Sequence, residues 1–279
     1  MEPIDAERGS WLRPSLDTGG QDLNVVPRGF PAYARVFHPA RRDRPTGEDG
    51  GPVMWAEVAR VFGKTMHPLA QYHRLAGPEV GEHREVLDSN GWRYSEPDQG
   101  NLAVHTLEPV ATVLCRHTTT PDSGVAAVWE GWGGFTGSAG YRQLTAVRGR
   151  LPGILGKLTA AHRSGAGLLP AKTMKNSRLS LPGRDYYLFA AAPRTFTDGP
   201  WIQDAPWNRD PYWPQSPNLL WPEDRAWVMV TEIDFDSTIV AGSPGLVADL
   251  IADPQIEAVQ INEGADLTSN ADEVNRPDA

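Results

Sequence analysis

The sequence predicts a single α+β domain with a mixed or antiparallel sheet flanked by helices, interrupted by a flexible basic insertion. The 279 residues include 40% hydrophobic and 22% charged side chains, which is ordinary for a chain that buries a core. Apolar runs with strand spacing and with helical spacing both occur along the chain. A strand-turn-helix unit from Asp224 to Asp253 is the best-specified element. Together these observations predict the fold class.

Three boundaries divide the chain. We predict a flexible arm over residues 1–24, a globular domain over residues 25–262, and an acidic disordered tail over residues 263–279. Residues 131–178 form a basic, glycine-rich insertion that is expected to be mobile. No carboxylate occurs between Glu130 and Asp185, and the remainder of the chain is strongly acidic. This uneven charge indicates an interaction segment.

The first half of the domain alternates between strand and helix patterns. The alternating apolar residues after the Gly-Phe-Pro turn at 29–31 predict a strand, and helical spacing or a proline in the first turn predicts helices. A continuous apolar run predicts a buried strand before the insertion. In chain order these are a strand at 33–37, helices at 52–62, 68–75 and 109–117, and a strand at 125–129.

After the insertion, a hairpin is predicted from 178–181 and 186–191 around the turn Pro182-Gly183. The apolar run 226–230 continues through 231–236 and reads as one strand, covered on both faces in its first half. Ser243 is the expected helix cap and Pro244 the first helical residue, with the helix ending at Asp253. A last short strand is expected near 256–261.

The acidic half of that strand offers candidate catalytic residues. Asp234-Phe235-Asp236-Ser237-Thr238 resembles the first motif, D-x-D-x-T, of haloacid-dehalogenase-like phosphotransferases. The resemblance implies Asp234 as nucleophile, Asp236 as acid/base and Mg²⁺ as cofactor. That family places the motif at the start of its domain, whereas here only 41 residues follow Thr238, and none is lysine.

The same strand offers a plainer metal site. The two-residue strand period puts Glu232, Asp234 and Asp236 on one face, where they are candidate ligands for Mg²⁺ or Ca²⁺. Same-face neighbours lie about 7 Å apart on a strand, which makes one shared ion difficult. A solvated acidic face of a half-buried strand is the favoured interpretation.

Aromatic residues form a second candidate site. Trp207, Trp213 and Trp221 lie in a proline-rich stretch over 199–222, and their flat faces suit stacking on a sugar or a base. The alternative is that these rings cover the edge of the core, because aromatic side chains dominate burial.

Composition excludes several classes. A net charge of −9 argues against general nucleic-acid binding. No apolar run approaches the roughly 18 residues of a membrane helix, so no membrane association is expected. The N-terminus is acidic where a signal peptide is basic, and the single Cys115 excludes an intrachain disulfide. A cytoplasmic location is therefore expected.

Several stretches together resemble a family of uncharacterised actinobacterial proteins, outside residues 1–24, 134–177 and the tail. They include RGFPAY at 28–33, WEGWG at 129–133 and LPGRDY at 181–186. The resemblance implies a shared fold and no activity. The favoured function is a non-catalytic cytoplasmic interaction or regulatory protein, immunity-like, with another protein as partner and no cofactor. The alternative is a metal-dependent phosphotransferase or hydrolase using Glu232, Asp234 and Asp236, with Mg²⁺.

Overall fold

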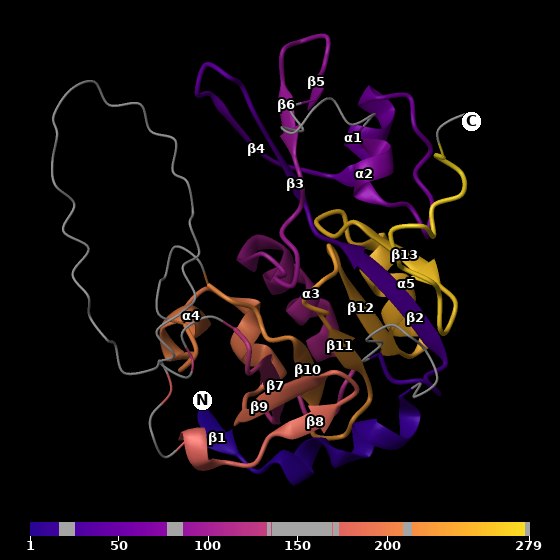
Figure 1. Cartoon of the computed structure of the whole chain (residues 1–279). Coiled ribbons are helices and arrows are strands. Elements are labelled where there is room, and N and C mark those ends of the chain that lie inside the picture. The colour runs from indigo at the N-terminus through magenta and orange to yellow at the C-terminus, as the bar shows by residue number, and fades with distance from the viewer. Residues whose placement is uncertain are drawn as a thin grey trace, which may run out of the picture.

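The computed structural model of the chain describes residues 1–16, 26–76, 86–132, 135, 169, 173–208 and 214–276. They form two antiparallel sheets with helices packed on them, so the protein has the α+β fold that the sequence predicts (Figure 1). Most of the predicted basic insertion lies outside the described residues. No helix of the described part is long and apolar enough to cross a membrane.

The main sheet has nine strands, all paired antiparallel. β8 (Leu179–Leu181) pairs with β9, off the main path. Along the path the order is β1 (Glu2–Ile4), β9 (Arg184–Ala190), β7 (Gly124–Trp129), β10 (Leu219–Pro222), β11 (Val228–Val230), β12 (Ser237–Gly242), β2 (Ala32–Phe37) and β13 (Ala258–Ile261).

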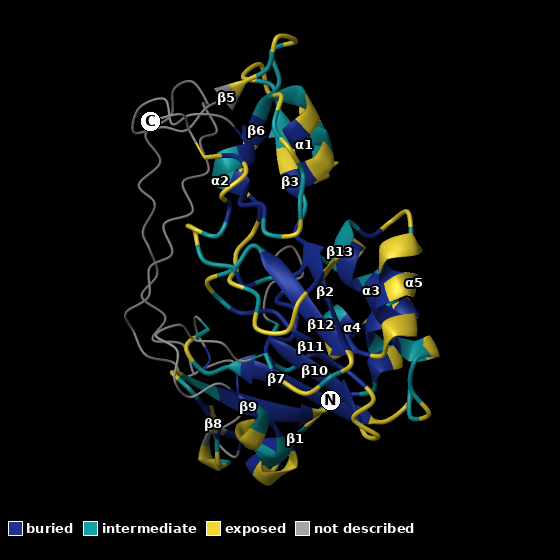
Figure 2. Cartoon of the chain, turned by 90° about the vertical axis from the view of Figure 1, so that its right-hand side faces the viewer, coloured by how far each residue is buried: buried dark blue, intermediate teal, exposed yellow. Residues whose placement is uncertain are grey.

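Both faces of the main sheet are buried, because alternate residues of each strand point to opposite sides. Helices α3 (Val104–Arg116) and α5 (Pro244–Ala252) cover one face, and α5 exposes its outer side (Figure 2). The short elements η3 (Pro193–Thr197) and α4 (Trp201–Asp204) extend this layer. The 3-10 helix η1 (Ala6–Ser15) packs on the other face. The remaining short helix, η2 (Thr173–Lys175), precedes β8.

A smaller sheet extends from the end of β2. Its strand order is β4 (Asp49–Val53), β3 (Ala40–Asp43), β6 (Arg93–Ser95) and β5 (Val86–Leu87). Helices α1 (Trp55–Val61) and α2 (Tyr72–Leu75) complete this region. A third core forms here, in which Trp55 packs between Phe37 and Tyr72. The chain therefore crosses directly from the main sheet into this region.

The predicted strand-turn-helix unit is confirmed in its second half. Ser243 caps α5, because its Oγ accepts a hydrogen bond of 3.1 Å from the Leu246 N–H, and Pro244 occupies the first turn. The prediction of a single strand over 226–236 is wrong. β11 ends at Val230, and β12 returns antiparallel to it after a turn. The carboxylate of Glu232 accepts the Asp234 N–H at 2.6 Å, and such local hydrogen bonds compete with strand pairing.

Both chain ends depart from the predicted arm and tail where they are described. Residues 2–4 pair with β9, and Leu12 of η1 is fully buried. Near the other end, Asp272 and Asn275 are buried. Residues 17–25 and 277–279 lie outside the described residues. The packed part of the chain therefore reaches well beyond 25–262.

Candidate functional site

A pocket of about 360 Å³ lies where four segments of the chain meet. This volume is at the lower end of the range for small-molecule sites, which are usually few in a protein. The segments are α2, the stretch before α3, the turn between β11 and β12, and the stretch near the C-terminus. The lining residues are Tyr72, His73, Glu96, Pro97, Gln99, Asp236 and Ser269.

Asp236 lines the pocket and forms an ion pair with Arg35 of β2. The guanidinium of Arg35 is 1% exposed, and its Nη2 lies 3.6 Å from Asp236 Oδ1. Burial lowers the pKa of Arg35 to about 10, and burial raises the pKa of Asp236 while the charge of Arg35 opposes that rise. The two groups therefore keep each other charged in a buried setting.

The other N–H groups of Arg35 bind neighbouring segments. Its Nε donates to Ser237 Oγ at 2.9 Å, and its Nη1 donates to the carbonyls of Pro68 and Ala70 at 3.1 and 2.8 Å. The guanidinium also lies over the rings of Phe37 and Trp55. Arg35 consequently cannot leave Asp236 without breaking the packing of the small-sheet region.

Tyr72 lines the pocket, and its hydroxyl group is buried without a hydrogen-bond partner among the described residues. Its side chain is 3% exposed. Burial raises the pKa of Tyr72, and the nearby charge of Glu96 raises it further. The charge of Glu96 also raises the pKa of Asp236. Glu96 therefore acts electrostatically on both Tyr72 and Asp236.

The wall formed by residues 96–100 is held by a buried histidine. His38 Nδ1 lies 2.6 Å from the Asp98 carbonyl oxygen, and its Nε2 lies 2.9 Å from Thr238 Oγ1. Burial lowers the pKa of His38 to about 4, so the ring is neutral at pH 7. Because a carbonyl can only accept, Nδ1 carries the proton and Nε2 accepts from Thr238, which is also 2.8 Å from Thr231 Oγ1.

The same wall contacts the β11–β12 turn through Gly100. Its N–H donates to the Phe235 carbonyl at 2.9 Å, and its φ of +67° favours glycine. A Cβ on Gly100 would lie 2.6 Å from the carbonyl oxygen of Ile233. Gln215 secures the other side, because its Nε2 donates to the Gly100 carbonyl at 2.9 Å. The turn that carries Asp236 and the wall that carries Glu96 are thus fixed to one another.

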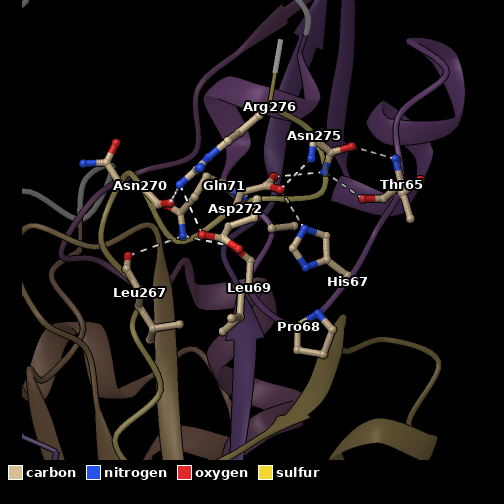
Figure 3. Close-up of polar contacts among 12 residues, drawn as sticks. Thr65, His67, Pro68, Leu69, Gln71, Leu267, Asn270, Asp272, Asn275 and Arg276 are labelled. Carbon is tan, nitrogen blue, oxygen red and sulfur yellow. Dashed lines mark hydrogen bonds and ion pairs between the residues drawn. The ribbon is translucent and has the colours of Figure 1, made fainter. Parts of the chain in front are cut away.

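The C-terminal wall is held by a polar cluster that we call the C-terminal clasp: Asp272 and Asn275 with Thr65, His67 and Gln71 (Figure 3). Asp272 accepts hydrogen bonds from His67 Nε2 at 2.8 Å and from the Gln71 N–H at 3.2 Å. Asn275 bonds both the N–H and the carbonyl of Thr65 at 2.9 Å. Burial opposes ionisation of Asp272, yet hydrogen bonds from Asn275 and His67 hold its pKa below the usual value. The clasp fixes the segment that carries Ser269.

The predicted acidic site residues do not converge. Arg184 binds Glu232 at 3.2 Å and Asp234 at 2.6 Å, whereas Asp236 faces Arg35. Burial raises the pKa of Glu232, against the hydrogen bond from the Asp234 N–H and the charge of Arg184. Among the described residues, no group of three or more His, Cys, Asp or Glu side chains is placed to hold a metal ion. Asp236 is the one predicted acidic residue that lines the pocket.

The tryptophans of the predicted aromatic site do not form one surface, because Trp207 and Trp221 lie on opposite faces of the main sheet. Trp207 is 1% exposed in the core on the face that α3 and α5 cover, and its Nε1 donates to the Gln215 carbonyl at 3.0 Å. Trp221 is 2% exposed in the core on the other face, edge-on to Trp11. Trp213 lies outside the described residues. Trp207 and Trp221 therefore serve the core, the alternative to a stacking surface.

Sequence reasoning missed Arg35, Tyr72 and Glu96. Arg35 had a signal, because it interrupts the apolar run from Tyr33 to Phe37, and a charge in a buried strand requires a partner. Tyr72 and Glu96 carry no such signal in the sequence, since both belong to the pocket only through contacts between distant segments.

Comparisons of the chain with protein-family models, with curated proteins and with solved structures found no match.

Proposed function

We propose that this protein is a non-catalytic interaction or regulatory protein of an immunity-like kind, that it acts in the cytoplasm, and that the pocket recognises its ligand. The observation that carries the proposal is the pairing of the candidate catalytic carboxylates with arginines. Asp234 bonds Arg184 at 2.6 Å, and Asp236 faces the buried Arg35. A nucleophilic carboxylate needs a free approach to its substrate. Paired carboxylates beside a preformed pocket suit binding better than chemistry.

The competing function is a metal-dependent phosphotransferase or hydrolase that uses Glu232, Asp234 and Asp236 with Mg²⁺. The observation in its favour is that Asp236 shares the pocket with Glu96, so that two carboxylates lie near one cavity. Against it, Glu232 and Asp234 are bound to Arg184 instead of facing that cavity. The two functions make opposite predictions for added metal.

Thermal unfolding with Mg²⁺, Mn²⁺ or Ca²⁺ separates the two functions, because a ligand that binds the folded state raises Tm. The proteins compared are wild type, Asp234→Asn, and the control Asp198→Asn, which removes an exposed charge outside the pocket. We expect equal, small metal effects in all three and no phosphate release from p-nitrophenyl phosphate. Stabilisation by Mg²⁺ that disappears in Asp234→Asn, together with metal-dependent phosphate release, would overturn the proposal.

A further inference from the structure

We propose that residues 264–276, which we call the C-terminal strap, form a movable wall of the pocket. The strap detaches from the rest of the molecule as one unit about Gly264 and carries Ser269 away from the cavity. This inference rests on the proposed binding function, because it states how a ligand gains entry to that site. The strap, yellow in Figure 1, runs from the end of β13 to the small-sheet region, and residues 264–276 form no helix or strand.

The strap is attached through very little apolar surface. Its two buried residues, Asp272 and Asn275, are both polar. Its apolar side chains are at most partly buried: Ala265 and Leu267 pack on the outside of a core cluster, and Val274 is 60% exposed. Segments with few buried apolar contacts open at a free energy well below that of global unfolding. The strap can therefore leave while both sheets stay folded.

The polar contacts at the end of the strap are linked to one another. The N–H and the Nδ2 of Asn275 both donate to the carboxylate of Asp272, at 2.9 Å. Asp272 in turn accepts the Gln71 N–H, and Asn275 accepts the Thr65 N–H. Water can replace these hydrogen bonds once the strap has left, so their net cost is modest. Because the two strap residues hold each other, their contacts with the small-sheet region are released together.

The start of the strap has the features of a hinge. Just before it, the Glu263 carboxylate accepts hydrogen bonds from the Tyr33 hydroxyl at 2.8 Å and from the Gly29 N–H at 2.7 Å. The next residue, Gly264, has a φ of +69°, and glycine adopts a wide range of backbone conformations. Hinges are a few loop positions that absorb such changes in φ and ψ. The fixed point is therefore Glu263, and the motion begins at Gly264.

The segment beneath the strap is held independently of it. The buried Arg35 donates from Nη1 to the carbonyls of Pro68 and Ala70, at 3.1 and 2.8 Å. These hydrogen bonds come from β2 and remain when the strap leaves. Gln71, which is 6% exposed, then has an N–H that has lost its acceptor and meets water. Its exchange with solvent therefore reports the opening of the strap.

Native-state hydrogen exchange of the full chain, followed by NMR, tests the motion. The N–H groups of Gln71 and Thr65 report the strap. The buried Thr231 N–H, which donates to the Asn218 carbonyl at 2.7 Å in the main sheet, reports global unfolding. Urea accelerates exchange in proportion to the surface that an opening exposes. After correction for intrinsic rates, we expect Gln71 and Thr65 to exchange at least about tenfold faster than Thr231, with little dependence on urea.

A matched pair of variants tests whether the strap moves as a unit. Leu267→Ala removes partly buried apolar surface, whereas Val274→Ala truncates an exposed side chain of the same strap. The side chain of Leu267 bonds neither reporter N–H. If the whole strap detaches, Leu267→Ala should accelerate exchange at Gln71 and at Thr65 equally, by about fivefold, which corresponds to about 1 kcal/mol. Val274→Ala should leave both rates unchanged.

Two results would overturn the inference. Exchange of Gln71 and Thr65 with the rate and urea dependence of Thr231 would show that the strap leaves only when the whole protein unfolds. Unchanged exchange of Gln71 and Thr65 in Leu267→Ala, with faster exchange of Thr231, would show that the end of the strap frays without the rest. Neither result touches the non-catalytic function, which metal-dependent phosphate release overturns whether or not the strap moves.

Discussion

The guanidinium of Arg35 and the imidazole of His38 place ionisable groups in and just after a strand that is otherwise apolar. Removing a charged group from water costs several kcal/mol unless partners replace the water. Arg35 finds these partners in two carbonyls, the hydroxyl of Ser237 and the carboxylate of Asp236. His38 is instead kept neutral. The hydrogen bonds of Arg35 join the main sheet to the small-sheet region, and the hydrogen bond of His38 to the Asp98 carbonyl fixes one wall of the pocket.

His38 should make the protein sensitive to acid. Its pKa is about 4 in the folded protein against 6.5 for a free histidine, so the unfolded chain binds a proton that the folded protein does not. The stabilising contribution is fully present above about pH 6.5 and is lost as pH falls toward about 4. The shift corresponds to a loss on the order of 3 kcal/mol. Urea unfolding at pH 7 and pH 4.5 measures the loss.

The comparison with His38→Gln isolates this group. Asp236, Glu232 and Glu257 have raised pKa values, so their contributions change in the opposite direction as pH falls. They are common to both proteins and cancel in the difference. We expect His38→Gln to be less stable at pH 7 and to lose less stability on acidification. An identical acid loss in the two proteins would contradict the role given to His38.

The contact between the residue 96–100 wall and the β11–β12 turn depends on one glycine. Gly100→Ala introduces a Cβ 2.6 Å from the Ile233 carbonyl oxygen, in addition to the strain of a φ near +67°. We expect the free energy of unfolding to fall by at least about 2 kcal/mol, because strain of this kind costs about 1–3 kcal/mol before any clash. Urea unfolding gives the value.

Gly63→Ala is the matched control for that change. Gly63 has a φ of +64°, and nothing lies within 4 Å of the position of its Cβ. This variant therefore reports the backbone strain alone, which we expect to cost about 1 kcal/mol. The excess loss in Gly100→Ala measures the clash with the turn. Equal losses would show that the turn moves freely away from the wall.

The sequence predicts those elements whose signals are local. The strands β2 and β7 and the β8–β9 hairpin follow from apolar patterns and a Pro-Gly turn, and α5 follows from its cap. The sequence does not predict the β11–β12 hairpin, because Ile233 and Phe235 continue the strand alternation through a turn that contains no glycine or proline. That turn depends on the hydrogen bond between Glu232 and the Asp234 N–H. The sequence predicts Asp236 as a candidate site residue together with Glu232 and Asp234, whereas in the structure Asp236 lines the pocket with Glu96 and Tyr72.

At the scale of the whole molecule, the end of the chain returns to the small-sheet region. Hydropathy predicts disorder for residues 263–279, because they contain few apolar side chains. The C-terminal clasp instead anchors this stretch through polar groups, with Asp272 fully buried and Asn275 6% exposed. Hydrogen bonds to Thr65 and Gln71 come from residues about 200 positions away in the sequence. Patterns of neighbouring residues carry no information on such contacts.

Removal of residues 265–279 tests whether the clasp supports the whole molecule. The deletion leaves the buried Gln71 N–H without its side-chain acceptor, at about 1–3 kcal/mol, and it removes Ser269 from the pocket. We expect urea unfolding to show a loss of at least about 1 kcal/mol. A chain ending at Arg276 keeps every clasp contact and is the control. A deleted chain as stable as that control would show that the small-sheet region holds its structure without the clasp.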